Sequence, residues 1–303
     1  MRIVLAGGSG QIGAVLKRAF AADDVTVLSR SGDVRWDGRT LGAWTNTLDG
    51  ADALINLAGR TVDCRYTADN RRAIMDSRLE STHVLREAIA QADVPPRVWL
   101  QSSTATIYAD TYGPANAEDG TLGGNEPNLP DTWRFSIDVA RRWEEAAAGA
   151  ATRTVLLRSA MVMSPDRGGV FDTLRTLVRR GLGGRAGSGR QFVSWIHDVD
   201  FANAIKLLIA REDIDGPVNL AAPEPLPYRD FMAALRKAEG MPFGLPATKW
   251  MLEAGAFLMR TETELVLKSR RVVPGRLVEA GFTFTHPTWP EAARDLVARR
   301  RAS

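Results

Sequence analysis

The stretch GGSGQIG at residues 7–13 limits the possible folds of this chain more than any other feature. It follows the apolar run RIVLA and opens a segment with helical periodicity. Gly7 permits a tight turn, Gly10 lets backbone N–H groups approach a pyrophosphate, and Gly13 allows a helix to pack closely on the strand. In this strand–turn–helix context, the glycines predict a dinucleotide-binding unit at the start of a sheet.

Strand-like and helical segments go on alternating through the first half of the chain. Apolar runs at 25–30, 51–59, 94–103 and 152–163 are separated by helical patterns, the longest at 67–92. Such alternation is typical of a parallel, doubly wound sheet with helices on both faces. We therefore predict an α/β fold of the Rossmann type.

The second half of the chain differs in pattern. A Gly/Arg-rich link at 179–190 precedes it, and helical patterns dominate afterwards. We expect a nucleotide-binding core over 1–165 and a smaller, mainly helical substrate-binding lobe over 166–303. A strand–helix unit near 190–222 is expected to return to the core. The helices expected in the lobe cover residues 227–239, 246–259 and 288–299.

The end of the second predicted strand indicates which dinucleotide is bound. An acidic residue at this place would hold the ribose 2′-hydroxyl of NAD(H). The sequence instead has Ser29 and Arg30. A guanidinium beside a hydroxyl suits a 2′-phosphate, which a carboxylate would repel. The pattern favours NADP(H) over NAD(H), with the alternative that Arg30 is simply an exposed residue at a strand end.

Composition excludes several classes of protein. The 303 residues carry 39 basic and 36 acidic side chains, so the net charge of +3 does not indicate nucleic-acid binding. The single cysteine, Cys64, cannot form an intrachain disulfide, which fits a reducing compartment. No run approaches the roughly 20 apolar residues of a membrane helix, and no signal peptide is recognisable. We expect a soluble, cytoplasmic protein.

The three histidines do not predict a metal site. His83, His197 and His286 are far apart in sequence, and neither an HxxxH pattern nor a cysteine cluster occurs. His197 precedes a predicted helix, where it could act as an acid or base. We favour the alternative that His197 and Asp198 cap that helix.

Four motifs occur in an order that carries a family resemblance: GGSGQIG, INLAG (55–59), SSTATIY (102–108) and WIHDVD (195–200). With them, the chain resembles the NAD-dependent epimerase/dehydratase family of the extended short-chain dehydrogenase/reductases. MDSRLEST (75–82) and KSRRVVPGRLVEAGFTF (268–284) resemble an atypical branch of that family. The resemblance extends over nearly the whole chain.

The resemblance implies a cofactor that lies across the strand ends and a small-molecule substrate between core and lobe. The oligomeric state stays open, a homodimer being one alternative. The residues implied in cofactor binding come from the glycine turn, the second strand and the INLAG motif. They are Gly7, Gly10, Gln11, Ile12, Gly13, Ser29, Arg30, Asn56, Ala58 and Gly59.

Enzymes of this family use a Tyr-x-x-x-Lys pair, in which the tyrosine is the acid or base and the lysine holds the nicotinamide ribose and lowers the tyrosine pKa. This chain contains no such pair. By order along the chain, the segment WRFSIDVARRWEE at 133–145 occupies that helix, with Ser136 and Ala140 at the two positions. Arg141 or Arg142 could replace the lysine's charge there.

Other hydroxyl groups remain as catalytic candidates. Thr104 or Ser103 falls where the family places a Ser or Thr after the fifth strand. Residues 109–131 form a long polar loop that we expect to act as a lid. Tyr108 at its start, with Tyr112 and Glu126 inside it, could bring a proton donor or base to the site.

Two functions of different classes follow. The first is an NADP(H)-dependent oxidoreductase or epimerase that acts on a sugar nucleotide or another carbonyl substrate. The second is a non-catalytic NADP(H)-binding redox sensor or interaction protein, which the missing Tyr-x-x-x-Lys pair suggests. The resemblance covers the substrate lobe as well as the cofactor core, and therefore favours the enzyme.

Overall fold

The computed structural model describes residues 1–32, 34–247 and 264–302. Within these residues, none of the helices is long and apolar enough to span a membrane. The helix expected over 246–259 lies, except for its first two positions, outside the described residues.

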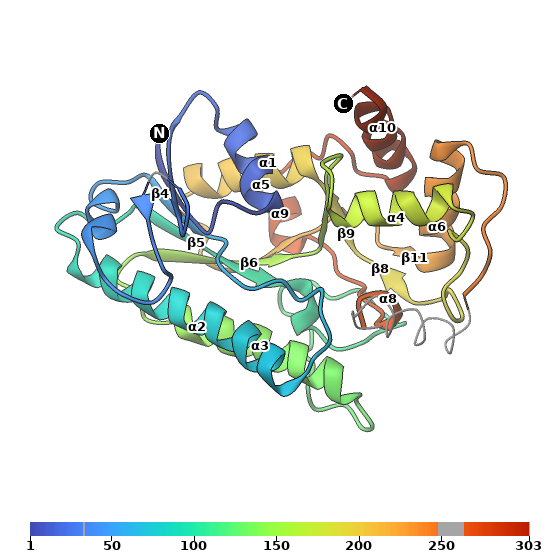
Figure 1. The fold of residues 1–303 in the computed structure, drawn as a ribbon, viewed down its shortest axis with the longest axis horizontal. Helices are drawn as coiled ribbons and strands as arrows, with labels where there is room; N and C mark the ends of the chain where they lie inside the picture. Colours follow the sequence, from blue (N-terminus) through green and yellow to red (C-terminus); the bar gives the residue numbers. More distant parts are fainter. Residues whose placement is uncertain (33, 248–263, 303) are drawn as a thin grey trace.

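A seven-stranded parallel sheet lies between two layers of helices (Figure 1). Its strand order is β10-β6-β5-β4-β1-β2-β3. The fold class predicted from the sequence is thereby confirmed. The strands, in chain order, are β1 (Arg2–Ala6), β2 (Asp24–Ser29), β3 (Val34–Arg35), β4 (Ala53–Asn56), β5 (Val98–Thr104), β6 (Arg153–Ser159) and β10 (Gly216–Leu220).

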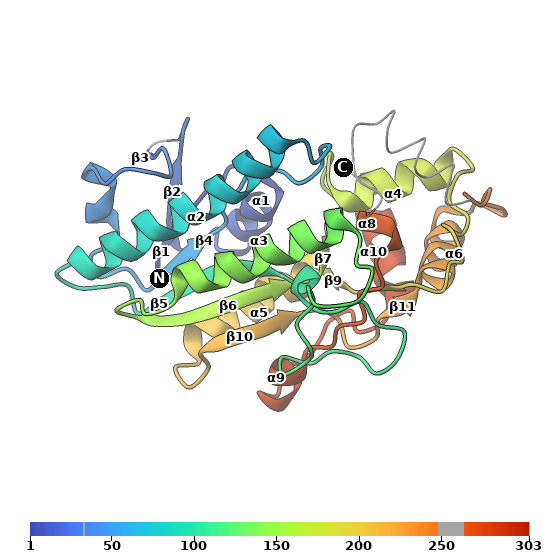
Figure 2. The same cartoon turned by 90° about the horizontal axis from the view of Figure 1, so that it is seen from below.

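Helices cover both faces of this sheet. On one face lie α1 (Gln11–Ala19) and α5 (Asp198–Ala210), and on the other lie α2 (Ala68–Gln91) and α3 (Asp131–Ala147). Figure 2 shows α2 and α3 side by side along their length, as their contacts also indicate. The strand β10 pairs with β6, so the chain returns to the sheet after leaving it.

The alternation of buried side chains along β1 explains the two layers, because successive residues of a strand point to opposite faces. Ile3 and Leu5 pack in the cluster formed with α1 and α5. Val4 and Ala6 pack in the cluster formed with α2. All four are almost completely buried. A strand that is apolar on both faces is typical of a parallel sheet covered on both sides.

The glycine turn between β1 and α1 is a place where backbones pack directly on one another. Gly7 has φ +77°, and a Cβ there would lie 2.7 Å from the backbone of Ala58 at the end of β4. A Cβ on Gly13 would lie 2.1 Å from the carbonyl oxygen of Gly8. Both positions therefore require glycine on steric grounds alone.

The C-terminal lobe has an apolar core of its own. It contains α4 (Val170–Arg179), α6 (Tyr228–Glu239) and α10 (Trp289–Ala302), which pack together. Trp289 stacks on Phe231 with ring centroids 4.0 Å apart and donates its indole N–H to the Phe231 carbonyl. The remaining elements are short: β7 (Met161–Met163) with β9 (Trp195–His197), β8 (Phe192–Val193) with β11 (Leu226–Pro227), α8 (Glu264–Leu267) and α9 (Gly275–Glu279).

Gly13→Ala is expected to destabilise the protein by about 3 kcal/mol or more, because the added methyl group overlaps the Gly8 backbone, which cannot move aside as a flexible side chain could. Gly10→Ala is the matched control: nothing lies within 4 Å of its Cβ position, so its cost stays within about 1 kcal/mol. Urea unfolding followed by circular dichroism measures both. Equal stability of the two variants would contradict this steric role of the turn.

Candidate functional site

A large cavity opens at the carboxyl ends of β1, β2 and β4, with a volume of ≈ 900 Å³. Cavities of this position and size hold nucleotides in open parallel α/β sheets. Its walls come from the glycine turn, the end of β2 with the segment that follows, and the end of β4 with the facing side of α2. The lining residues are Gly7, Ser9, Gly10, Ser29, Arg30, Trp36, Asp37, Gly38, Arg39, Leu57, Ala58, Gly59, Arg60, Thr61, Ala73, Ser77, Glu80 and Ser81.

The N-terminus of α1 is built to receive an anion. Gly10 is its N-cap, no side chain caps the helix, and the space around the Gly10 Cβ position is open. The first N–H groups of a helix carry partial positive charge and need acceptors. The Nε2 atom of Gln11 is also buried and has no hydrogen-bond partner among the described residues. That amide lies against Gly169, where a Cβ would come within 1.8 Å of it, and Gln11 does not line the cavity. A phosphate therefore fits the backbone N–H groups of the helix N-terminus.

Arginines surround the far end of the same cavity. Arg30 is exposed at the end of β2, next to the buried Ser29. Arg39 and Arg60 also line the cavity, and Arg39 donates to Glu80 at 2.7 Å. The wall also holds Asp37 and Glu80, so the three guanidinium groups outnumber the carboxylates by one, and Arg30 is the arginine placed beside a hydroxyl to receive a phosphate. Arg39 and Arg60 are not among the residues predicted from the sequence, because arginines in loops carry no motif that distinguishes them from solvated ones.

The INLAG motif contributes to the large cavity in two ways. Ala58 and Gly59 line the cavity. Asn56 is fully buried: its Oδ1 accepts the N–H of Ala58 at 3.0 Å, and its Nδ2 donates to Gln101 at 2.9 Å. Asn56 thus shapes the turn that carries the two lining residues. Ile12, likewise absent from the cavity wall, packs on the apolar core beside α1.

A second, smaller cavity of ≈ 120 Å³ lies beside the first. The two approach each other at Gly59, where a Cβ would come within 3.1 Å of the Arg78 guanidinium carbon. The smaller cavity draws its walls from α2, α3, the end of β5 and the C-terminal lobe. Its lining residues are Val62, Tyr66, Ile74, Arg78, Thr104, Thr106, Phe135, Ser136, Val139, Trp143, Glu264 and Arg270.

The three hydroxyl groups that the sequence offers as catalytic candidates do not lie in one site. Thr104 lines the second cavity, and its Oγ1 accepts the N–H of Thr106. Ser103 points elsewhere and donates to Glu144 at 2.6 Å. Tyr108 is buried, donates to Asn219 at 2.8 Å and accepts from Arg158. Only Thr104 of the three belongs to the wall of the second cavity.

The polar loop 109–131 is joined to the lobe. Thr111 and Asn116 donate backbone hydrogen bonds to the carbonyl oxygens of Ser269 and Arg271. Tyr112 is 51% exposed, and Glu126 accepts the N–H of Gly124 at 2.6 Å. Neither Tyr112 nor Glu126 lines the second cavity. The loop therefore supports the lobe beside the site.

A polar network crosses the second cavity from core to lobe. Ser136 of α3 donates to Glu264 at 2.5 Å, and Tyr66 lies 3.3 Å from the same serine oxygen. Glu264 is almost completely buried and forms an ion pair with Arg270. Burial lowers the pKa of Arg270 and raises the pKa of Tyr66 to about 12. No sequence motif had marked Tyr66, Glu264 or Arg270 as site residues.

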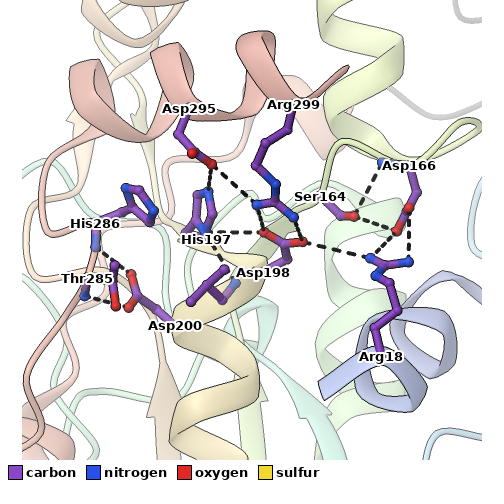
Figure 3. Close-up of polar contacts among 11 residues, drawn as sticks. Arg18, Ser164, Asp166, His197, Asp198, Asp200, Thr285, His286, Asp295 and Arg299 are labelled. Atoms are coloured by element: carbon purple, nitrogen blue, oxygen red, sulfur yellow. Dashed lines mark hydrogen bonds and ion pairs between the residues drawn. The ribbon is translucent and has the colours of Figure 1, made fainter. Parts of the chain in front are cut away.

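His197 caps α5, the role that the sequence favours for it (Figure 3). Its Nδ1 accepts the N–H of Val199 at 3.2 Å, and its Nε2 lies 2.9 Å from Asp295 of α10. Asp198 receives two bonds from Arg299 at 2.8 and 2.9 Å. Burial lowers the pKa of the enclosed His197 ring. This network joins the start of α5 to α10 of the lobe.

His197, His286 and Asp295 offer ligand atoms within 4.8 Å of one another. The tautomer of His197 is nevertheless set by its cap, because an Nδ1 that accepts a hydrogen bond leaves the ring proton on Nε2. That nitrogen donates to Asp295 and has no lone pair for a metal. The geometry thus assigns His197 and Asp295 to a hydrogen-bonded pair, and the His286 ring packs beside it with its centroid 3.9 Å from that of His197.

The parallel sheet, the glycine turn and the cavity at the strand ends define a dinucleotide-binding protein of the Rossmann class. Residues 3–221 match the NAD dependent epimerase/dehydratase family, and residues 247–296 match a domain of unknown function, DUF1731. The chain belongs to the NAD dependent epimerase/dehydratase family.

Relatives match almost the full length of the chain. Epimerase family protein SDR39U1 of Bos taurus is 31% identical, with 98% of this chain and 100% of that protein covered. An epimerase family protein of Mycobacterium bovis is 32% identical, with 96% and 95% covered. The crystal structure of human SDR39U1 (isoform 2) with NADPH is similar at a TM-score of 0.87 and 28% identity, with 98% and 99% covered.

His197→Asn is expected to flatten the pH dependence of stability below pH 6.5. Because the folded-state pKa of His197 lies below its ordinary value of 6.5, the unfolded chain binds a proton that the folded chain does not. The free energy of unfolding therefore falls as the pH drops through 6.5, by up to about 1.4 kcal/mol per pH unit. Urea unfolding at several pH values compares the variant with wild type and with His83→Asn, an exposed control. Identical slopes in all three would contradict the prediction.

Proposed function

We propose that the protein is an NADP(H)-dependent oxidoreductase or epimerase that acts on a small carbonyl compound or sugar nucleotide. The observation that carries the proposal is the pairing of two cavities. The larger has a helix N-terminus and an arginine beside a hydroxyl for a dinucleotide, and the smaller, beside it, holds buried hydroxyl and charged groups. Buried titratable groups in a cavity are typical of catalytic sites.

Within this proposal, the glycine turn holds the pyrophosphate at the N-terminus of α1. Gln11 acts behind the turn, since its amide lies against Gly169 and it does not line the cavity. Gly13 and Ile12 act indirectly, by bringing the helix against the sheet. Ser29 and Arg30 bind the 2′-phosphate. The similarity of the chain to human SDR39U1, whose crystal structure is one with NADPH, supports this choice of dinucleotide.

The second cavity is the proposed substrate site. Bound NADPH would supply a hydride to the substrate there. Thr104 places its hydroxyl at the end of β5, where it can donate a hydrogen bond to a carbonyl oxygen. Ser103 and Tyr108 keep their side chains in buried contacts outside this cavity, so the proposal assigns them to support. Arg142 pairs with Asp138 at 3.0 Å on the surface and is left out.

Arg30→Glu is expected to weaken NADPH binding by tenfold or more, because a charge-assisted hydrogen bond contributes about 1.5–3 kcal/mol and the new carboxylate repels the phosphate. NADH affinity should change by less than about threefold. Arg35→Glu, an exposed residue of β3 outside the cavity wall, is the control with the same change in charge. Fluorescence titration with both cofactors measures the effect; equal losses in the two variants would refute the assignment of Arg30.

Wild-type protein is expected to oxidise NADPH with at least one member of a panel of aldehydes, ketones and sugar nucleotides. Thr104→Val removes the proposed donor to the carbonyl oxygen and should lower kcat/KM by about tenfold or more, while NADPH affinity is kept. Absorbance at 340 nm and fluorescence titration give the two readouts. Stoichiometric NADPH binding without any oxidation across the panel would contradict the enzyme and favour the non-catalytic sensor.

A further inference from the structure

Two residues from one segment of the chain reach the second cavity, Tyr66 outside the quoted motifs and Arg78 within MDSRLEST (75–82). Tyr66 stands just before α2, and Arg78 lies inside that helix. Neither belongs to α3, the helix on which relatives would carry their Tyr-x-x-x-Lys pair. They nonetheless bring a phenol and a cation, the two groups that this pair would supply, to the wall of the same cavity.

The phenol of Tyr66 lies against the position of the missing tyrosine. Its oxygen is 3.3 Å from Oγ of Ser136, the residue that takes the tyrosine's place in the helix. Its ring packs edge-on against Phe135, with centroids 5.1 Å apart. The aromatic ring thus comes from the segment before α2, while its hydroxyl lies beside α3.

The direction of the hydrogen bonds makes Tyr66 a donor. A carboxylate oxygen only accepts, so Ser136 gives its single proton to Glu264 at 2.5 Å. The serine oxygen can then only accept from Tyr66. Because burial raises the pKa of Tyr66 to about 12, the phenol keeps its proton near neutral pH. A protonated phenol in a substrate cavity is suited to general acid catalysis.

Arg78 presents a half-buried charge without a carboxylate partner. No carboxylate oxygen of the described residues lies within 4.0 Å of its guanidinium nitrogens; Nη1 donates only to the carbonyl oxygens of Arg60 and Ile74, both at 3.0 Å. Its guanidinium lies over the Trp143 ring at 4.9 Å, and burial lowers its pKa to about 10. The carbonyl bonds and the indole ring leave the positive charge of Arg78 without a counter-ion among the described residues, which points to an anionic or polar ligand.

We propose that Tyr66 and Arg78 replace the missing Tyr-x-x-x-Lys pair, with Tyr66 as the proton donor to the substrate oxygen and Arg78 as the cation at the boundary between cofactor and substrate. The inference rests on the proposed function. During reduction, the carbonyl carbon gains a hydride from the reduced nicotinamide, and the C=O π electrons move to oxygen. The Tyr66 O–H bond breaks to protonate that oxygen, and the phenolate regains a proton from solvent.

The role of Arg78 is tested without turnover, by NADPH fluorescence titration. Arg78→Met should weaken binding about tenfold, and Arg78→Lys should restore most of the affinity because it keeps the charge. Arg72→Met, on an exposed position of the same helix, should bind like wild type. Thermal unfolding of each variant shows that it is folded. Wild-type affinity in a folded Arg78→Met variant would overturn the assignment.

The role of Tyr66 is tested with 4-nitrobenzaldehyde and NADPH. Tyr66→Phe should lower kcat by about 100-fold or more, with NADPH affinity within about threefold of wild type; Tyr112→Phe, an exposed tyrosine, should keep full activity. The wild-type kcat should be independent of pH from 6 to 9, since the donor stays protonated. A Tyr66→Phe variant as active as wild type would overturn the inference and leave the proposed function standing. Wild type that binds NADPH but reduces no carbonyl compound would overturn both.

Discussion

The direct packing of backbone on backbone at the glycine turn is the contact on which the rest of the structure depends. At Gly7, the turn packs against the backbone that follows β4. At Gly13, the first turn of α1 packs against the backbone of Gly8. Because no side chain separates these segments, the helix N-terminus reaches the edge of the sheet and faces the large cavity. The cofactor end of the site is therefore a product of backbone geometry.

This dependence on backbone geometry explains why the core could be predicted from the sequence. Turn glycines, strand-length apolar runs and helical periodicity are local signals, and each of the sheet's long strands carries one. Gly7, Gly10, Ser29, Arg30, Ala58 and Gly59, all predicted from such local motifs, line the large cavity. Four other residues of the same motifs do not line the cavity and support it from behind: Gln11, Ile12, Gly13 and Asn56. The motif does not reveal this difference, because tertiary contacts decide whether a side chain lines a cavity or packs behind it.

The second cavity could not be predicted in the same way. Its polar network joins Tyr66, Ser136 and Glu264, which are separated along the chain by 70 and 128 residues. Periodicity identifies α3 as a helix, but it does not show which residues of other elements its Ser136 meets. The same limit applies to the hydroxyls near β5: Ser103 and Thr104 are neighbours in sequence, yet strand alternation directs one to Glu144 and the other to the cavity.

Charged and polar contacts join the lobe to the core, and two of them have a consequence for the site. One joint is the ion pair of Glu264 and Arg270 with Ser136 of α3; the other links His197 and Asp198 to Asp295 and Arg299 of α10 (Figure 3). Buried polar contacts have narrow geometric requirements, unlike apolar packing, which permits sliding. Glu264 and Arg270 also line the second cavity, and Glu264 accepts the proton of Ser136, the residue that faces the Tyr66 hydroxyl. In the proposed mechanism, a change in lobe position would therefore alter substrate fit and proton donation together.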